Sequence, residues 1–279
     1  MEIQLVLDKV TTALRGASGV VSVVLGGSRA KGTNRPDADI DIGIYYDLTQ
    51  GFSTEEIAEI ASKLDDTRRK DIITPLGAWG EWINGGGWLV MDGWHVDFIF
   101  RDIHRVEQVI QDCLAGKISA HYHTGHPHAY INGMYLGEVA ICKILTDQNG
   151  RLKALKEKAT PYSPKMKKSM VNYFMFEAGF SLMFAEDNAN KDDLYYVTGH
   201  LFRAVSCLNQ VLFALNEEYC LNEKKAVKMV ANFAQAPANY KGRVDEIFSL
   251  LSTNPSATIN AYSKLKQLVE EVKVITERV

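Results

Sequence analysis

Two aspartates separated by a single residue, Asp39 and Asp41, have the spacing in this sequence that most clearly indicates chemistry. They alternate with isoleucines in Asp39-Ile-Asp-Ile-Gly-Ile44, which is the pattern of a half-buried strand. Because successive side chains of a strand point to opposite faces, both carboxylates share one face and the isoleucines share the other. Two neighbouring carboxylates repel each other, and a divalent cation between them relieves that repulsion. The pattern therefore predicts a metal site.

A glycine-rich segment with nearby cations precedes this strand. Val20–Leu25 is a β-branched run that predicts a first strand, and Gly26-Gly27-Ser28 then predicts a turn. Glycine lets the backbone approach a phosphate closely and leaves N–H groups exposed to it, so Gly27 and Ser28 are predicted phosphate contacts. Arg29 and Lys31 add positive charge beside them, and a solvated basic loop is the alternative to a phosphate contact.

A third carboxylate, Asp97, lies in a second pair of predicted strands. Asp92-Gly93 separates two apolar runs and predicts a two-residue hairpin turn. On the return strand Asp97 shares a face with His95 and Ile99. An acid within an apolar strand is costly unless it is paired or bound to a metal, so Asp97 is predicted to be one or the other. The alternative is an aspartate on the exposed face of an edge strand.

Gly27-Ser28, ten further residues and then Asp39-Ile-Asp41 resemble the motif of the nucleotidyltransferase superfamily, which includes DNA polymerase beta and the antibiotic nucleotidyltransferases. The resemblance implies two Mg²⁺ ions bound by Asp39, Asp41 and Asp97, with a nucleoside triphosphate, expected to be ATP, as substrate. It further implies transfer of the nucleoside monophosphate to an acceptor hydroxyl and release of pyrophosphate. Asp97 would lower the pKa of that hydroxyl or take its proton, and Glu138 is the alternative base.

The pattern of apolar residues predicts an α+β chain, with a small mixed-sheet domain followed by an all-α helical bundle. Helical spacing at 2–16 and 52–64 falls in the first part, and from residue 132 onward the predicted helices cover 135–145, 163–188, 193–215 and a last segment from residue 255. We therefore expect a catalytic domain at 1–115, a connecting loop at 116–131 and a helical bundle at 132–279. The loop contains His121, His123, His126 and His128, and a polar connection is favoured there over a zinc site.

Composition restricts the partners. A net charge of −3 and a pI of about 6.2 provide no overall basic surface, which argues against a protein that binds duplex nucleic acid. The four cysteines form no C-x-x-C pair, which predicts buried free thiols in a reducing compartment. No signal peptide and no apolar run long enough to span a bilayer are found, so a cytoplasmic protein without a membrane partner is expected.

The acceptor and the oligomeric state stay open at this level. A small antibiotic-like molecule is the first expectation for the acceptor. The candidates in the helical half to line its site are Glu138, Glu177, His200 and Arg203, although for each alone a satisfied or surface polar residue is favoured. The alternatives are a protein-modifying (AMPylating) enzyme of toxin–antitoxin or signalling type and a catalytically silent nucleotide-binding module. Three converging acids argue against the silent module, because binding alone does not need them.

Overall fold

The computed structural model describes residues 3–191 and 193–278. The chain divides into two compact units, each built from two stretches of sequence. The first unit comprises Met1–Gln111 and Tyr135–Pro161, and the second comprises Asp112–Met134 and Tyr162–Val279. The first contains a mixed sheet with helices and the second is mainly helical, which confirms the predicted α+β class.

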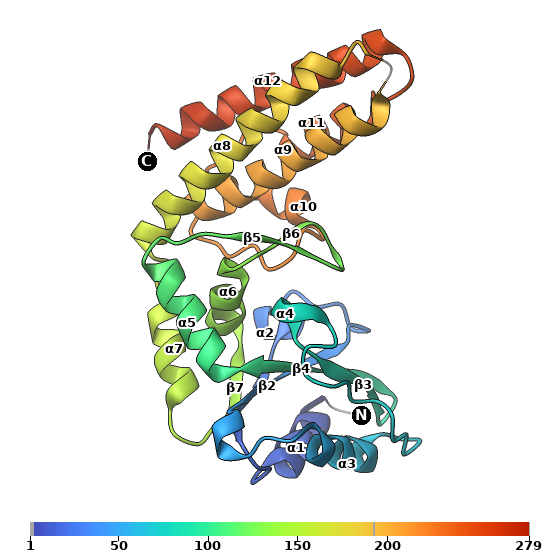
Figure 1. Ribbon diagram of the computed structural model, residues 1–279, viewed down its shortest axis with the longest axis vertical. Helices are drawn as coiled ribbons and strands as arrows, with labels where there is room; N and C mark the ends of the chain where they lie inside the picture. Colours follow the sequence, from blue (N-terminus) through green and yellow to red (C-terminus); the bar gives the residue numbers. More distant parts are fainter. Residues whose placement is uncertain (1–2, 192, 279) are drawn as a thin grey trace. The chain divides into compact units, whose positions relative to one another are not determined.

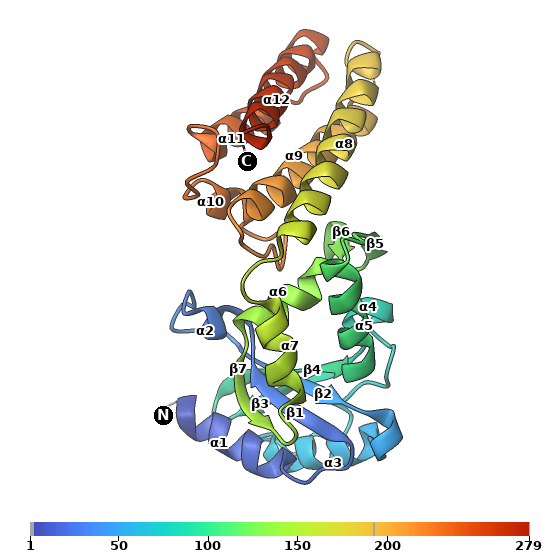
Figure 2. The same ribbon diagram turned by 90° about the vertical axis from the view of Figure 1, so that its left-hand side faces the viewer.

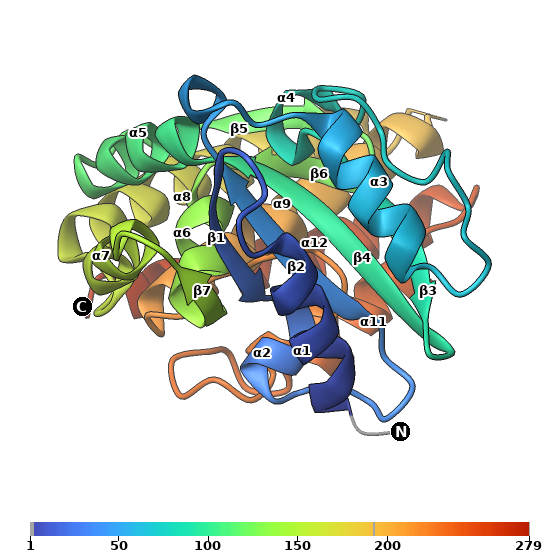
Figure 3. The same cartoon turned by 90° about the horizontal axis from the view of Figure 1, so that it is seen from below.

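The sheet of the first unit has five strands in the order β3-β4-β2-β1-β7. The strands β2 and β4 are parallel, whereas the other neighbouring pairs are antiparallel. Helices α1 (Ile3–Leu14) and α3 (Thr54–Leu64) lie along one face of this sheet (Figures 1 and 3). The strand bounds are Val20–Leu25 for β1, Ile40–Tyr46 for β2, Gly86–Met91 for β3, Trp94–Asp102 for β4 and Lys143–Asp147 for β7.

The alternation read from the sequence determines which sheet face is buried against α1 and α3. Ile40, Ile42 and Ile44 of β2 are fully buried in this core, as are Val96, Phe98 and Phe100 of β4. Burying each such side chain contributes about 1.5–3 kcal/mol to folding. The odd-numbered residues, including Asp41 and Asp97, therefore lie on the opposite face. The predicted hairpin is also confirmed, since Asp92 and Gly93 both have positive φ angles between β3 and β4.

Shorter elements lie wholly or mostly in the first unit. Their bounds are Gly27–Lys31 for α2, Leu48–Gln50 for the 3-10 helix η1, Gly80–Ile83 for α4, Ile103–Leu114 for α5, Gly133–Ile141 for α6 and Arg151–Ala159 for α7. The boundaries between the two units fall within α5 and α6.

The predicted helix at 135–145 is wrong beyond Ile141. Residues 143–147 form strand β7, which pairs with β1 in an antiparallel register that places Ile144 opposite Val24 (Figure 2). Without β7, strand β1 would be an edge with unpaired backbone groups, and this pairing outweighs the helical periodicity of residues 144 and 145. Residues 135–161 consequently belong to the first unit, so compactness divides the chain differently from the predicted boundaries at 115 and 132.

The predicted connecting loop at 116–131 is largely a β-hairpin. Strands β5 (Ala120–His123) and β6 (His126–Ile131) are antiparallel, and Gly125 in the turn between them has a positive φ. The sequence pattern missed these strands because their alternating positions carry histidines and tyrosines instead of aliphatic residues.

The second unit contains the predicted long helices. Their bounds are Pro164–Asn188 for α8, Leu194–Leu215 for α9 and Pro255–Thr276 for α12, with the shorter helices α10 (Ala226–Val230) and α11 (Tyr240–Ser249) between them. The caps Ser163, Asp193 and Asn254 each accept a backbone N–H bond in the first turn of their helix. All four cysteines are buried and free, as predicted. In the described part of the chain, no helix has the length and apolar character needed to cross a membrane.

Candidate active site

The pairing of β2 with β4 brings two of the predicted acids together. Asp41 lies directly opposite Asp97 in the parallel register, and Asp39 immediately precedes β2 on the same side as Asp41. Neighbouring strands are about 4.8 Å apart, so the two carboxylates start from adjacent backbone positions. Asp41 and Asp97 are partly buried, whereas Asp39 is exposed.

The protonation equilibria of these acids reflect their mutual repulsion. Burial, together with the charges of Asp41 and Asp39, raises the pKa of Asp97 to about 6. Burial and the charge of Asp39 also raise the pKa of Asp41, an effect that the nearby Arg29 opposes. The three carboxylates therefore interact electrostatically on one face of the sheet.

The donor set fits a hard divalent cation, although the side chains do not already form a closed ligand cluster. Among the described residues, no group of three or more His, Cys, Asp or Glu side chains is close enough to hold a metal ion. Carboxylate oxygens are the ligands that Mg²⁺ and Ca²⁺ prefer. Burial and mutual repulsion raise the pKa values of Asp41 and Asp97, and a bound cation would remove the repulsion, so these residues suit a divalent metal.

The glycines before Asp41 make room for its carboxylate. The Gly26 N–H donates a hydrogen bond to the backbone carbonyl of Asp41 at 2.8 Å. Gly27 has a φ of +57°, and a Cβ at that position would lie 1.8 Å from the Asp41 Oδ2 atom. The predicted turn at 26–28 is instead the start of the five-residue helix α2, which also carries Ser28 and Lys31. A glycine at 27 is thus required by the position of Asp41.

Arg29 holds the loop that carries Asp39. Its Nε atom donates to the carbonyl oxygens of Ala38 at 3.1 Å and Asp39 at 3.0 Å, and Nη2 donates to those of Pro36 at 3.2 Å and of Ala38. Its guanidinium also lies over the ring of Trp94, 5.0 Å from the centroid. These contacts tie the guanidinium to the backbone of the loop, and the phosphate contact of Arg29 stays a prediction.

Further along the same sheet face, Arg101 forms a buried ion pair that the sequence did not single out. Arg101 is only 3% exposed, and its Nε and Nη2 atoms each lie 2.8 Å from a carboxylate oxygen of Glu138 on α6. Arg101 Nη1 donates to the carbonyl of Ile83 at 2.7 Å. Both carboxylate oxygens of Glu138, the alternative base, thus accept bonds from Arg101. The available signal was the period of two, which places Arg101 on the face of Asp97.

The remaining candidates lie in the second unit. The backbone N–H of His128 donates to Glu223 at 2.6 Å, its ring Nε2 lies 3.9 Å from the Cys207 sulfur, and burial lowers the pKa of the ring to about 4. Arg203 Nε donates to Glu177 at 3.0 Å, and the His200 ring stacks on a phenylalanine with centroids 5.3 Å apart. These contacts give the side chains structural partners within their own unit.

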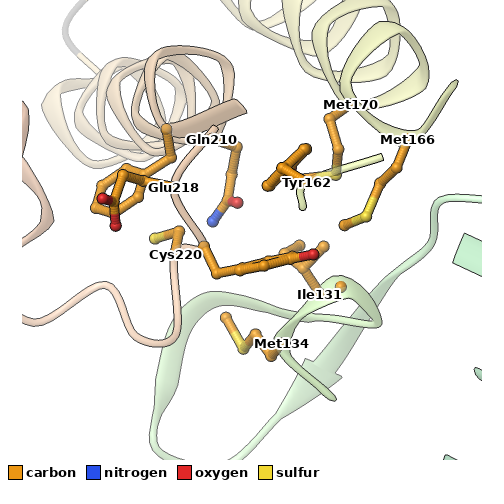
Figure 4. A pocket seen from close by; sticks show the side chains of 11 residues that line it. Ile131, Met134, Tyr162, Met166, Met170, Gln210, Glu218 and Cys220 are labelled. Atoms are coloured by element: carbon orange, nitrogen blue, oxygen red, sulfur yellow. The ribbon is translucent and has the colours of Figure 1, made fainter. Parts of the chain in front are cut away.

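A small cavity in the second unit is lined mainly by apolar side chains (Figure 4). Met134, Met166, Met170 and Tyr162 face it, and Gln210 contributes a polar group. Its volume is about 10 Å³, which is about the space of one water molecule. Without rearrangement, this cavity is too small for a substrate.

The comparison with protein families agrees with the fold of the first unit. Residues 7–114 match the family described as "Nucleotidyltransferase domain". This match supports a nucleotidyltransferase domain over that part of the chain, and through it a transferase of that general kind.

A solved structure is also similar, namely that of a nucleotidyltransferase-like protein from Exiguobacterium sibiricum 255-15. The two chains are 9% identical, the similarity covers 96% of this chain and 75% of the other, and the TM-score is 0.48. At that level the similarity defines neither a substrate nor a site. The sequence matched no curated protein.

Proposed function

We propose that this protein transfers a nucleoside monophosphate, expected to be AMP, from a nucleoside triphosphate to a hydroxyl of a small-molecule acceptor. The observation that carries the proposal is the register of β2 and β4, which sets Asp41 beside Asp97 with Asp39 on the same side. The nucleotidyltransferase domain at residues 7–114 supports the reaction class. The acceptor and the preference for ATP are the finer parts of the proposal.

The predicted site residues of the first unit have separate roles in this proposal. Asp39, Asp41 and Asp97 would hold the metal. The resemblance to nucleotidyltransferases implies two Mg²⁺ ions. When bound, Mg²⁺ offsets the charge of the triphosphate and of the transition state. Gly27 and Ser28, at the start of α2, offer backbone N–H groups to the β- and γ-phosphates. Asp97, the acid farthest from α2 in strand order, accepts the proton of the acceptor hydroxyl.

The test is Mg²⁺-dependent pyrophosphate release from each of the four nucleoside triphosphates, measured with antibiotic, nucleotide and protein acceptors. Asp39→Asn, Asp41→Asn and Asp97→Asn should each lower turnover by about 100-fold or more, because a misplaced reacting group already costs on that order. Asp37→Asn is the matched control, since Asp37 lies in the same loop with a side chain that is 70% exposed. Full activity in the Asp41→Asn variant would show that the metal assignment is wrong.

The same experiment separates the alternatives. Intact-mass spectrometry of the protein acceptors would reveal a nucleotide added to a side chain, which would identify a protein-modifying enzyme. Failure to release pyrophosphate with every nucleotide and acceptor would support a silent nucleotide-binding module.

A further inference from the structure

A pair of stacked tryptophans lies on the same sheet face as the three acids. Trp88 of β3 lies directly opposite Asp97 of β4, and Asp97 lies directly opposite Asp41 of β2. These three side chains therefore form a row across one face of the sheet, in the strand order visible in Figure 3. Trp88 is 58% exposed although it is among the largest apolar side chains. An indole ring is thus presented to solvent beside the candidate catalytic acid.

The surrounding loop fixes the second ring of the pair. The rings of Trp79 and Trp88 are stacked, with centroids 4.7 Å apart and planes inclined by 30°. The backbone N–H of Trp79 donates to the carbonyl of Asn84 at 2.9 Å, and the Asn84 side chain donates to the Tyr46 hydroxyl at 2.8 Å. Gly86 leaves space for the Trp79 ring, because a Cβ there would lie 2.9 Å from it. The pair is therefore a preformed flat surface, which reduces the entropy cost of binding a ring.

The direction of the reaction indicates which substrate this surface faces. In an in-line displacement the attacking and leaving oxygens lie on opposite sides of the phosphorus atom. If Gly27 and Ser28 hold the leaving pyrophosphate at the β1 side of Asp41, the attacking hydroxyl enters from the side of Asp97 and β3. Trp88 is the large exposed side chain on that side.

We propose that Trp88, backed by Trp79, is the surface on which a ring of the acceptor stacks, and that this ring carries the hydroxyl that is nucleotidylated. This inference rests on the proposed function and specifies its acceptor. The hydroxyl oxygen bonds to the α-phosphorus, the bond from that phosphorus to the pyrophosphate oxygen breaks, and the hydroxyl proton passes to Asp97.

The spacing of the row selects the kind of acceptor. Directly opposite residues of an antiparallel pair have Cα atoms about 4.5–5.5 Å apart, which is close to the width of a six-membered ring. A ring stacked on Trp88 thus brings a hydroxyl on its own edge to Asp97, whereas a long flexible arm would carry the hydroxyl past it. Both sugar-like rings and phenols offer a flat face to indole, so the shared chemistry is a ring-borne hydroxyl.

The test compares ring alcohols with open-chain alcohols in the ATP-dependent transfer assay. The ring probes are myo-inositol, methyl glucoside and N-acetyltyrosinamide, and the open-chain probes are sorbitol and N-acetylserinamide. Trp88→Ala should raise the KM for the ring acceptor by roughly 5- to 100-fold, the range for losing one aromatic stacking partner, and leave the KM for ATP unchanged. Trp88→Phe should retain most of the affinity. Leu5→Ala is the control, because Leu5 is 50% exposed on α1, the helix along the opposite sheet face.

A preference for the sugar-like probes or for the phenol would support the inference and identify the source of the ring. Equal use of open-chain acceptors, or a rise in the KM for ATP instead of the acceptor, would overturn it. A ligand-observed NMR titration of the ring probes without ATP distinguishes this inference from the proposed function. If no acceptor supports pyrophosphate release from ATP, the proposed function fails. Binding of the ring probes that weakens in Trp88→Ala would still support the stacking surface, and unchanged binding would overturn it.

Discussion

Replacing Gly27 by alanine tests the candidate site through a single added methyl group. The new Cβ would lie 1.8 Å from Oδ2 and 2.6 Å from Cγ of Asp41. Ordinary carbon contacts are about 3.5–4.0 Å, so the two groups cannot coexist in these positions. The aspartate side chain is short and can rotate about χ1 into another staggered position. The Gly27→Ala protein is therefore expected to fold, with the Asp41 carboxylate turned away from Asp97.

The structure separates the cost in stability from the cost in activity. Gly27 has a φ of +57°, and an alanine in the left-handed region costs about 1–2 kcal/mol. Gly32 closes the same helix with a φ of +72° and nothing within 4 Å of its added Cβ. Gly32→Ala thus reproduces the backbone strain without the contact. Both variants should lose about 1–2 kcal/mol of unfolding free energy, but only Gly27→Ala should lose turnover, by about 100-fold, because its metal ligand moves by more than 1 Å.

The assay is Mg²⁺-dependent pyrophosphate release, with unfolding followed by circular dichroism for each variant. Comparable melting temperatures for Gly27→Ala and Gly32→Ala, with activity lost only in the former, would support the position of Asp41 in the site. If Gly27→Ala kept the turnover of Gly32→Ala, the Asp41 carboxylate would not take part in the reaction.

Three further perturbations should have separable effects. Asp97→Asn removes a buried carboxylate that its neighbours repel, so without metal at pH 7 it should stabilise the fold by about 1–2 kcal/mol. Burial and neighbouring acids raise the folded-state pKa of Asp97 to about 6, so calorimetry should show this gain in stability vanish below about pH 4. Mg²⁺ should raise the melting temperature of the wild type but not of the variant. Arg29→Lys retains the charge but has fewer donors for the loop carbonyls, so it should weaken Mg²⁺ activation about tenfold with little change in melting temperature. An unchanged Mg²⁺ dependence would show that Arg29 does not position the loop that carries Asp39. Asp65 is fully buried and accepts bonds from Arg69 and from backbone N–H groups, which hold its pKa well below the usual range. Asp65→Asn should cost about 2–3 kcal/mol in urea unfolding at pH 7. A lowered pKa stabilises fully above the unfolded value and progressively less below it, so this difference should shrink below about pH 4.

The elements that depend on local chemistry were predictable. The turn at Asp92-Gly93 needs two positive φ angles, and the cap at Ser163 needs one side-chain oxygen before a proline, so both are visible in a few residues. The common face of Asp39 and Asp41 follows from the period of two in the same way. By contrast, placing Asp97 on the neighbouring strand relied on the resemblance to nucleotidyltransferases, because strand order is a tertiary property.

The features that were missed depend on partners distant in the sequence. Residues 143–147 have a helical pattern of their own and become a strand only because β1 offers an edge more than 100 residues earlier. The destination of the Arg29 side chain depends on the fold of the 36–39 loop, and the Arg101–Glu138 pair joins a strand to a helix. No periodicity within a short window contains such information.

The position of β7 in the sequence, beyond the family match, has a consequence for any attempt to isolate the nucleotidyltransferase domain. A fragment ending near residue 114, where the family match stops, would leave one side of β1 without hydrogen-bonding partners. Such an open edge recruits strands from other molecules, so this fragment should aggregate on expression. Extending the fragment to residue 161 restores β7 and α7 and should yield a soluble product. The helices that follow residue 161 could then be added as a separate polypeptide to test their effect on the fragment.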